Sequence, residues 1–319
     1  MEKYGHRDPN FEFGTNPCSE IILRPYQFCN LTEVVVRHDD TKETLLHKVR
    51  LASILGTIQS TFTKFPYLRK VWQRNTEEER LLGVSLTGIY DNKLMCTQGK
   101  ELDDLLATLR EEARKANEEF AGLLGIPTSA AVTCVKPSGT VSKLVDSASG
   151  IHPRHSKYYI RRVRGDKKDP LTQFLISQGI PNEPCVYKPD QTIVFSFPIK
   201  APDGITRSGV TPISHLELWL TYQRHWCEHK PSVTISVEEK DWPSVGAWTW
   251  NHFDEISGVS YLPYDGGTYR QAPYEECTEE AYEELKAKVP SINWEAFKEV
   301  TDNVEGAQQL ACSAGVCEI

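Results

Sequence analysis

Short apolar runs alternate with amphipathic stretches along most of this 319-residue chain. Apolar side chains recur with helical spacing from Leu45 to Ile58 and again from Leu102 to Leu123. The runs expected to form strands lie at 81–87, 130–135, 158–163, 192–197, 232–237 and 258–262. Repeated alternation of strand and helix implies right-handed crossovers and a mainly parallel sheet or barrel, with ligand chemistry in the loops beyond the strand ends. The sequence therefore predicts an α/β fold.

Two of the expected helices have well-marked starts. Asp169-Pro170 and Thr211-Pro212 each place a capping side chain before a proline. Proline suits the first position of a helix because the N–H that it lacks has no partner there in any case. Gly179 suits the end of the first of these helices, since glycine readily takes the left-handed conformation that closes a helix.

The two ends of the chain differ from the regular part between them. Residues 1–17 are polar, lack apolar periodicity and are expected to form an irregular loop that leads into the fold. After Val300 the residues become small and polar, so 301–319 are expected to form a flexible tail. Residues 1–300 are expected to form the folded part.

Composition excludes several classes of protein. The net charge of −8 argues against binding to duplex nucleic acid or to an anionic membrane, so any phosphate site must be built locally. No apolar run approaches the roughly 18 residues of a membrane helix, and the first residues lack the apolar core of a signal peptide. We therefore expect a cytoplasmic protein. Its nine cysteines indicate reduced thiols, transient disulfides or metal binding rather than a permanent disulfide framework.

A cysteine and a carboxylate lie two residues apart near the N-terminus, at Cys18 and Glu20. Side chains two apart on an extended loop point the same way, so this thiol and this acid could share one substrate. The alternative is an ordinary loop with a buried cysteine and a solvated glutamate, because free cysteine is usually a small hydrophobe. The pair alone leaves both interpretations open.

A second pair of thiols, Cys312 and Cys317, lies near the C-terminus. Their spacing on a mobile segment suits a disulfide that forms and exchanges with other thiols. An unremarkable tail or half of a zinc site are the alternatives, and a zinc site needs a second ligand pair. Further donors could come only from His225, Cys227 and His229. Their helical context favours core or surface roles, so we expect this chain to ligate no metal directly.

The segment 135–142, with the sequence Val-Lys-Pro-Ser-Gly-Thr-Val-Ser, follows an expected strand. Anions bind where several backbone amides converge, and Lys136 or Lys143 would add positive charge. A plain turn explains the segment equally well, because it lacks the Gly-Lys-Ser/Thr ending of the P-loop. Residues 149–163 add histidine and arginine to the same region, where they could contact phosphate or substrate.

Taken in this order, the segments strongly resemble the catalytic subunit of ribonucleotide reductase, and most closely the adenosylcobalamin-dependent (class II) enzymes that act on ribonucleoside triphosphates. Asn16-Pro17-Cys18-Ser19-Glu20 resembles the finger-loop motif of this family, which would span about 14–22. The segment 25–31 resembles the strand that carries a redox cysteine, here Cys29, and the short interval from Cys18 is typical of the cobalamin class. The resemblance runs the length of the chain.

The resemblance implies a thiyl-radical mechanism. Cys18 would carry the radical that removes the 3′ hydrogen of the ribose, after adenosylcobalamin supplies the initiating radical. Glu20 would accept the proton of the 3′ hydroxyl, as a general base within hydrogen-bond reach, and Asn16 would bind the ribose hydroxyls. The substrate phosphates would contact Pro137, Ser138, Gly139, Thr140 and Val141.

The resemblance also implies where the electrons come from. Cys29 would form a disulfide with a second active-site cysteine as the substrate is reduced. Cys312 and Cys317 would reduce that disulfide by exchange, and thioredoxin or a similar dithiol protein would reduce them in turn. DNA precursor synthesis would be the purpose of the reaction.

One departure from the family pattern concerns the start of the chain. The family's second active-site cysteine precedes the finger loop, and no cysteine precedes Cys18 here. The implied fold is therefore the C-terminal half of a ten-stranded α/β barrel of the ribonucleotide reductase type. Half a barrel would expose strand edges and apolar surface, so we expect a partner chain that carries the N-terminal half.

Two other functions remain open from the sequence. A thiol-disulfide oxidoreductase could use Cys312 and Cys317 without any nucleotide, although the chain lacks a Cys-x-x-Cys motif in a compact fold. A non-catalytic module could have kept the fold and lost the reaction. Against that module stands the presence of the motif residues Asn16, Cys18, Glu20, Cys29, Cys312 and Cys317.

Overall fold

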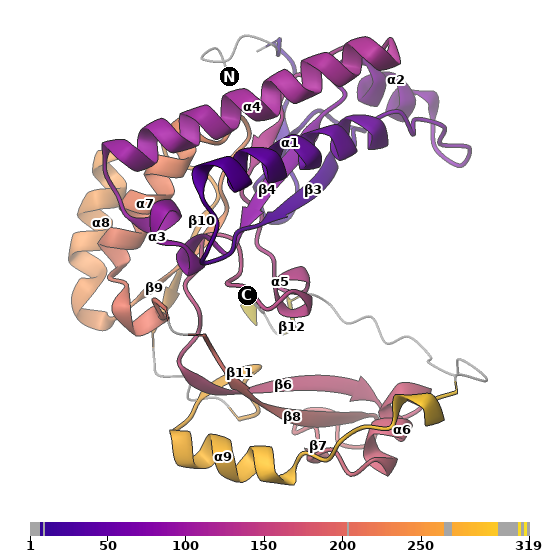
Figure 1. Cartoon of the computed structure of the whole chain (residues 1–319), viewed down its shortest axis with the longest axis vertical. Coiled ribbons are helices and arrows are strands. Elements are labelled where there is room, and N and C mark those ends of the chain that lie inside the picture. The colour runs from indigo at the N-terminus through magenta and orange to yellow at the C-terminus, as the bar shows by residue number, and fades with distance from the viewer. Residues whose placement is uncertain are drawn as a thin grey trace. The chain divides into compact units, whose positions relative to one another are not determined.

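The computed structural model describes residues 7–8, 10–202, 204–264 and 270–298, and the backbone of 312–313 and 316–317. The chain forms two compact units (Figure 1). The first contains the residues up to Pro153 together with Gly209–Pro263, and the second contains Arg154–Ser208 together with residues from Tyr264 onward. The sheets of one unit are separate from those of the other.

Parallel strands form the centre of the first unit. β3 (Asn30–Val35), β4 (Leu82–Thr87) and β5 (Thr133–Cys134) form one parallel sheet in that order. β9 (Val233–Val237) pairs in parallel with β10 (Val259–Pro263), and a parallel bridge from Val135 to Pro231 joins the two sheets. The strands therefore follow each other as β3, β4, β5, β9 and β10, which agrees with the α/β fold that the alternation predicts.

Helices supply the crossovers that parallel strands require. Two long helices, α1 (Lys42–Gln59) and α4 (Lys100–Leu124), pack on each other, and α1 also packs against β3 and β4 (Figure 1). The other helices of this unit are α2 (Lys70–Glu79), α3 (Lys93–Cys96), α5 (Val141–Leu144), α7 (Pro212–His225) and α8 (Trp242–Asn251). Fully buried side chains such as Leu45, Leu106 and Trp219 join helices and strands in one hydrophobic core, whose burial stabilises the unit.

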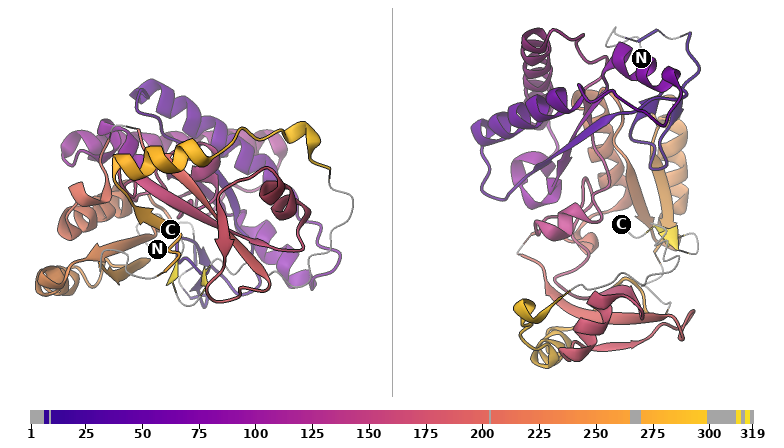
Figure 2. Two further views of the ribbon diagram at one scale, coloured as in Figure 1. Left: turned by 90° about the horizontal axis from the view of Figure 1, so that it is seen from below. Right: turned by 90° about the vertical axis from the view of Figure 1, so that its right-hand side faces the viewer.

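The second unit is built differently. Its four-stranded sheet has the order β11 (Tyr274–Glu276), β6 (Tyr158–Asp166), β8 (Thr192–Lys200) and β7 (Asn182–Pro184). All its pairings are antiparallel, and α9 (Glu279–Lys288) packs against β6 and β8 (Figure 2). The strands expected at 158–163 and 192–197 exist, but the expected parallel arrangement is wrong for them. Apolar periodicity identifies a strand without fixing the direction of its neighbour.

The helix starts read from the sequence are confirmed. Asp169 accepts a hydrogen bond from the backbone N–H of Leu171 at the start of α6 (Pro170–Ser177). Thr211 caps α7 in the same way by accepting from Ser214 N–H. Gly179 follows α6 with φ of +80°, a conformation that glycine adopts at no steric cost.

The described part of the tail is a short hairpin. β12 (Cys312–Ser313) pairs antiparallel with β13 (Val316–Cys317), and the register places Cys312 opposite Cys317. The other residues of 301–319 lie outside the described part of the chain, and with them most of the predicted flexible tail. Among the described residues, no helix has both the length and the apolar character needed to span a membrane.

Candidate active site

A small hairpin carries three of the residues predicted from the sequence. β1 (Gly14–Thr15) pairs antiparallel with β2 (Ile22–Leu23), and residues 16–21 between them form what we call the hairpin turn. Asn16 closes this turn, because its side-chain Oδ1 accepts a 3.0 Å hydrogen bond from the backbone N–H of Ile21. Its own N–H donates to the Ile21 carbonyl at 3.3 Å.

Glu20 is the most unusual residue of the hairpin turn. Its side chain is fully buried, with 0% exposure, and its Oε1 lies 2.6 Å from the ammonium Nζ of Lys136. Its Oε2 is buried and makes no hydrogen bond to any residue that the structure describes. Burial opposes the charged form of Lys136, but the hydrogen bond and charge of Glu20 outweigh it and raise the pKa of the ammonium group. The result is a charged pair with one carboxylate oxygen left without a protein partner.

The thiols of Cys18 and Cys29 lie in the same electrostatic environment. Cys18, on the hairpin turn, and Cys29, just before β3, are both partly exposed and in the reduced form. Burial raises the pKa of Cys29, the negative charge of Glu20 raises it further, and Arg7 and Lys136 oppose the change. Cys18 interacts electrostatically with Lys136. Cys29 is therefore a protonated thiol at neutral pH, in the field of the Glu20–Lys136 pair.

The predicted phosphate loop begins beside this pair, directly after Lys136. The Ser138 N–H donates to Ser149 Oγ at 3.0 Å, and its hydroxyl donates to Glu33 Oε2 at 2.9 Å. Burial raises the pKa of Glu33, although Ser138 and Lys136 counteract it. Gly139 is half-buried, whereas Thr140 and Val141 are exposed. The loop therefore lies at the site with an accessible distal end, and two carboxylates flank its beginning.

A buried ionic network anchors the strand that follows the hairpin turn. Arg7 donates to both oxygens of Glu79 at 2.9 and 2.7 Å, and to the Ile22 carbonyl at 2.8 Å. Arg24 and Gln27 complete the network, with Nη2 and Nε2 at 3.1 and 2.6 Å from Glu79. Burial disfavours the Glu79 carboxylate, but Arg7 and Gln27 outweigh it and lower its pKa. β2 is thus fixed to the end of α2.

His229 makes a second connection to β2. Its Nε2–H donates to the Leu82 carbonyl on β4 at 2.9 Å, and its Nδ1 accepts from Ile22 N–H at 3.4 Å. Burial, assisted by the positive charge of Arg7, lowers its pKa to about 3, so the ring is neutral. Of the zinc donors that the sequence left open, His229 and Cys227 are buried and His225 ends α7. In the described ranges, no three His, Cys, Asp or Glu side chains gather as a metal site.

The sequence reading missed the partner of Glu20 and the anchor of β2. It assigned Lys136 to phosphate, whereas its ammonium group contacts Glu20 from 116 positions away. Arg7 belongs to the segment expected to be an irregular loop, yet it is tied to Glu79. Long-range contacts of this kind leave no local pattern. The one local signal was a lysine, Lys136, directly after an apolar run, which is a position where a charged side chain can serve a site.

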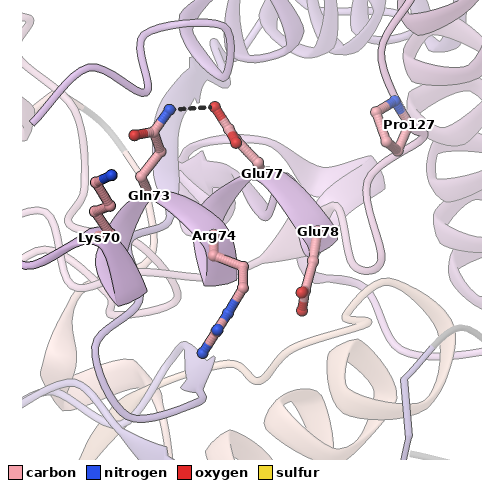
Figure 3. A pocket seen from close by; sticks show the side chains of 6 residues that line it. All are labelled: Lys70, Gln73, Arg74, Glu77, Glu78 and Pro127. Atoms are coloured by element: carbon pink, nitrogen blue, oxygen red, sulfur yellow. Dashed lines mark hydrogen bonds between the residues drawn. The ribbon is translucent and has the colours of Figure 1, made fainter.

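A cavity of about 450 Å³ lies along α2 (Figure 3). Five of its six lining residues are of polar or charged types, and Gln73 donates to Glu77 across one turn of the helix at 2.9 Å. The lining residues are Lys70, Gln73, Arg74, Glu77, Glu78 and Pro127. None of them is a residue that the motifs predict.

Comparisons with known proteins give a consistent result. No protein-family model matches the chain. It is 30% identical over 312 residues to the adenosylcobalamin-dependent ribonucleoside-triphosphate reductase of Euglena gracilis, covering 95% of this chain and 42% of that protein. The reductase of the same name from Lactobacillus gasseri is also 30% identical, over 96% of this chain and 45% of its own length. The chain therefore spans less than half the length of these relatives.

Solved structures add the fold. A B12-dependent (class II) ribonucleotide reductase superposes with a TM-score of 0.74 and 28% identity, over 86% of this chain and 42% of that one. The class Id ribonucleotide reductase alpha subunit of Actinobacillus ureae, with a TM-score of 0.53 and 14% identity over 79% of this chain and 53% of its own, shares the fold. The resemblance that the motifs predict is thereby confirmed: over nearly its whole length, this chain is similar to part of the adenosylcobalamin-dependent ribonucleoside-triphosphate reductases and of a class II ribonucleotide reductase structure.

Proposed function

We propose that this chain is part of a ribonucleotide reductase that converts ribonucleoside triphosphates into 2′-deoxyribonucleotides by a thiyl-radical mechanism. The observation that carries the proposal is the hairpin turn. It holds the partly exposed Cys18 two residues from a buried carboxylate whose Oε2 has no hydrogen bond among the described residues. An unpaired buried oxygen is costly, so a hydroxyl that donates to it is stabilising. The 3′ hydroxyl of a ribose supplies such a donor.

The reaction follows from these positions. The Cys18 thiyl radical takes the hydrogen atom from C3′, while Glu20 Oε2 accepts the proton of the 3′ hydroxyl. The C2′ hydroxyl then leaves as water. Two electrons and two protons come from two thiols, which become a disulfide, and Cys18 returns its hydrogen atom to C3′. Cys29 is one of the two thiols, and its raised pKa suits it to deliver hydrogen rather than to act as a thiolate.

The initiating radical requires a cofactor. Adenosylcobalamin appears in the names of the relatives, and when bound it would supply a carbon-centred radical that oxidises a thiol. The partly exposed Cys18 thiol fits that task. We therefore assign to this chain the thiol that receives the radical.

Two further segments would bind the substrate phosphates and receive electrons from the reductant. The substrate phosphates would contact Pro137, Ser138, Gly139, Thr140 and Val141, and the exposure of Thr140 and Val141 supports access to this loop. Cys312 and Cys317 would exchange with the active-site disulfide and be reduced by thioredoxin or a similar dithiol protein. Their opposed places in the β12–β13 pairing support their action as a pair.

The rest of the reductase must come from the same or another polypeptide. In this proposal the parallel strands β3, β4, β5, β9 and β10 form half of a ten-stranded barrel. The hairpin turn is its finger loop, and a partner chain carries the other half. Exposed apolar side chains form a stripe along α1 and the residues that directly follow it. This stripe supports the proposal of a partner chain, because large exposed apolar patches mark interaction sites. The stripe consists of Leu51, Leu55, Ile58 and Phe62, which are 52, 60, 42 and 72% exposed.

Activity of the reconstituted protein tests the proposal. The chain is combined with the missing part of a class II reductase, and deoxynucleotide formation is measured with adenosylcobalamin and dithiothreitol. We expect turnover with wild-type chain and none with Cys18→Ser, because serine cannot form the thiyl radical. Full activity of Cys18→Ser would contradict the proposal. A thiol-disulfide oxidoreductase, which the relatives do not favour, would instead turn over dithiols without nucleotide.

A further inference from the structure

Lys136 connects the predicted phosphate loop to the hairpin turn. It follows β5, and its backbone N–H donates to Ser85 Oγ on β4 at 2.8 Å, which fixes its place at the end of the sheet. From there its ammonium group reaches Glu20 Oε1 at 2.6 Å. The Lys136 side chain is 35% exposed, and the Glu20 side chain is fully buried. The chain thus places a cation against one oxygen of the carboxylate and leaves the other oxygen without a described partner.

We propose that Lys136 is a positioning residue for the reaction: its ammonium group holds Glu20 as a carboxylate and orients Oε2 toward the sugar hydroxyl. This inference rests on the proposed function. A buried carboxylate without a cation tends to take up a proton, and a protonated Glu20 could not act as a base. The hydrogen bond from Lys136 to Oε1 also fixes the rotation of the carboxylate group. Oε2 is then the oxygen that remains to accept a hydrogen bond from the substrate.

The geometry argues against the simpler role of Lys136 as a phosphate ligand. Its ammonium group is already bound to a carboxylate, and the next loop side chain, Ser138, donates to a second carboxylate, Glu33. Two carboxylates therefore flank the beginning of the loop, and Lys136 interacts with both. Its loss should then act on the chemical step, measured by kcat, more than on triphosphate binding, measured by KM.

The pH dependence of the reaction gives a direct readout of this role. The other charged or titratable groups that interact with Lys136 or Glu20 are Cys18, Cys29, Glu33 and Cys134, and Arg7 acts on Cys29. The Lys136 pKa is raised, so the cation persists across the assay range and does not itself produce an acid limb. Removing the cation destabilises the carboxylate, so activity should be lost at a higher pH than in the wild type.

The test compares Lys136→Met with Lys136→Arg in the reconstituted reductase, with dithiothreitol as reductant. For Lys136→Met we expect kcat to fall about tenfold or more, as weakening a general base implies. We expect KM for the triphosphate to change less than about twofold, and the acid limb to move to higher pH. Lys136→Arg should recover much of kcat and restore the acid limb. Lys100→Met, on the exposed face of α4, removes an equal charge and should change neither parameter.

A second readout needs no turnover. Because Lys136 interacts electrostatically with Cys18, its loss should slow alkylation of Cys18 by iodoacetamide at a given pH, measured by peptide mass spectrometry. If Lys136→Met does not fold, the double variant Lys136→Met/Glu20→Gln, which leaves no unpaired charge at this pair, takes its place. Its reference is then Glu20→Gln alone, and the double variant should alkylate Cys18 more slowly than that single variant.

The outcomes separate this inference from the proposed function. A wild-type kcat and pH profile in Lys136→Met, with Cys18→Ser inactive, would overturn the role of Lys136 and leave the reductase assignment intact. A raised KM with unchanged kcat would make Lys136 a phosphate ligand and also overturn it. Activity in Cys18→Ser would instead overturn the proposed function itself.

Discussion

Two carboxylates of the first unit are buried equally well and held very differently. Glu79 receives two hydrogen bonds from Arg7, one from Gln27 and an ion pair with Arg24, so both its oxygens are occupied. Glu20 is fully buried but receives one cation on Oε1 and no described partner on Oε2. A structural carboxylate is saturated by its neighbours, because any missing hydrogen bond costs stability. In the proposed function, the second partner of Glu20 is the substrate.

The largest effect that this comparison predicts is on catalysis. Glu20→Gln keeps the size of the side chain and removes the base, so kcat should fall about 10²- to 10⁴-fold in the reconstituted reductase. The variant should lose little stability, because Lys136 is partly exposed and can regain water. Deoxynucleotide formation and thermal unfolding measured on one preparation check both statements. Loss of fold together with loss of activity would make Glu20 structural.

The converse substitution should act on stability. Glu79→Gln removes the described counter-charge of Arg7 and leaves Arg24 with Glu78 alone. The Arg7 and Arg24 side chains are only 5 and 8% exposed. Breaking a buried pair in this way costs about 3–5 kcal/mol of the free energy of unfolding. Urea unfolding of the chain measures this loss, and Lys100→Met is the control for a surface pair. A Glu79→Gln chain as stable as the wild type would show that the network is dispensable.

The smallest expected effect is on the pH dependence of stability, through His229, which makes the second connection to β2. The pKa of His229 falls from its ordinary 6.5 to about 3 in the folded chain, mainly through burial. Between these values the unfolded chain binds a proton that the folded chain does not, so stability decreases as the pH falls from about 6.5 toward 3. His152 and His215, with pKa values lowered to about 4 and about 3, contribute in the same direction.

His229→Gln isolates the share of this one ring. Glutamine can still donate to the Leu82 carbonyl but does not titrate, so the slope of stability against pH should become shallower between pH 7 and 5. Urea midpoints at several pH values measure the slope for both proteins, and the difference at pH 7 reports the cost of the substitution itself. An unchanged slope would assign the acid sensitivity to other groups.

The sequence predicted the individual helices and strands better than the way in which they pair and pack. The amphipathic helices, the caps at Asp169 and Thr211 and the positions of the strands follow from local spacing, and the structure contains them. The antiparallel sheet of the second unit was missed, because the direction of a strand depends on how the chain returns to it. The motif Asn16 to Glu20 indicated the site, since its residues are adjacent in sequence.

The partners of the site residues were beyond local reasoning. Lys136 and Glu20 meet only because the parallel strands bring β5 beside the hairpin turn, and neither residue type indicates the other. His229 was weighed as a zinc donor, whereas its two ring nitrogens bind the backbone of β2 and β4. Roles of this kind depend on the folded geometry, and the roles proposed for Cys29, Cys312 and Cys317 remain predictions.

Cleavage of the 3′ carbon–hydrogen bond is the most direct test of the central claim that the hairpin turn holds a radical thiol beside a base. The reconstituted reductase is given a ribonucleoside triphosphate deuterated at C3′, and the rate of deoxynucleotide formation is compared with that of the unlabelled substrate under single-turnover conditions. The account predicts slower conversion of the deuterated substrate by the wild type, and no conversion of either substrate by Cys18→Ser. Equal conversion of both substrates by Cys18→Ser, at the wild-type rate, would contradict it.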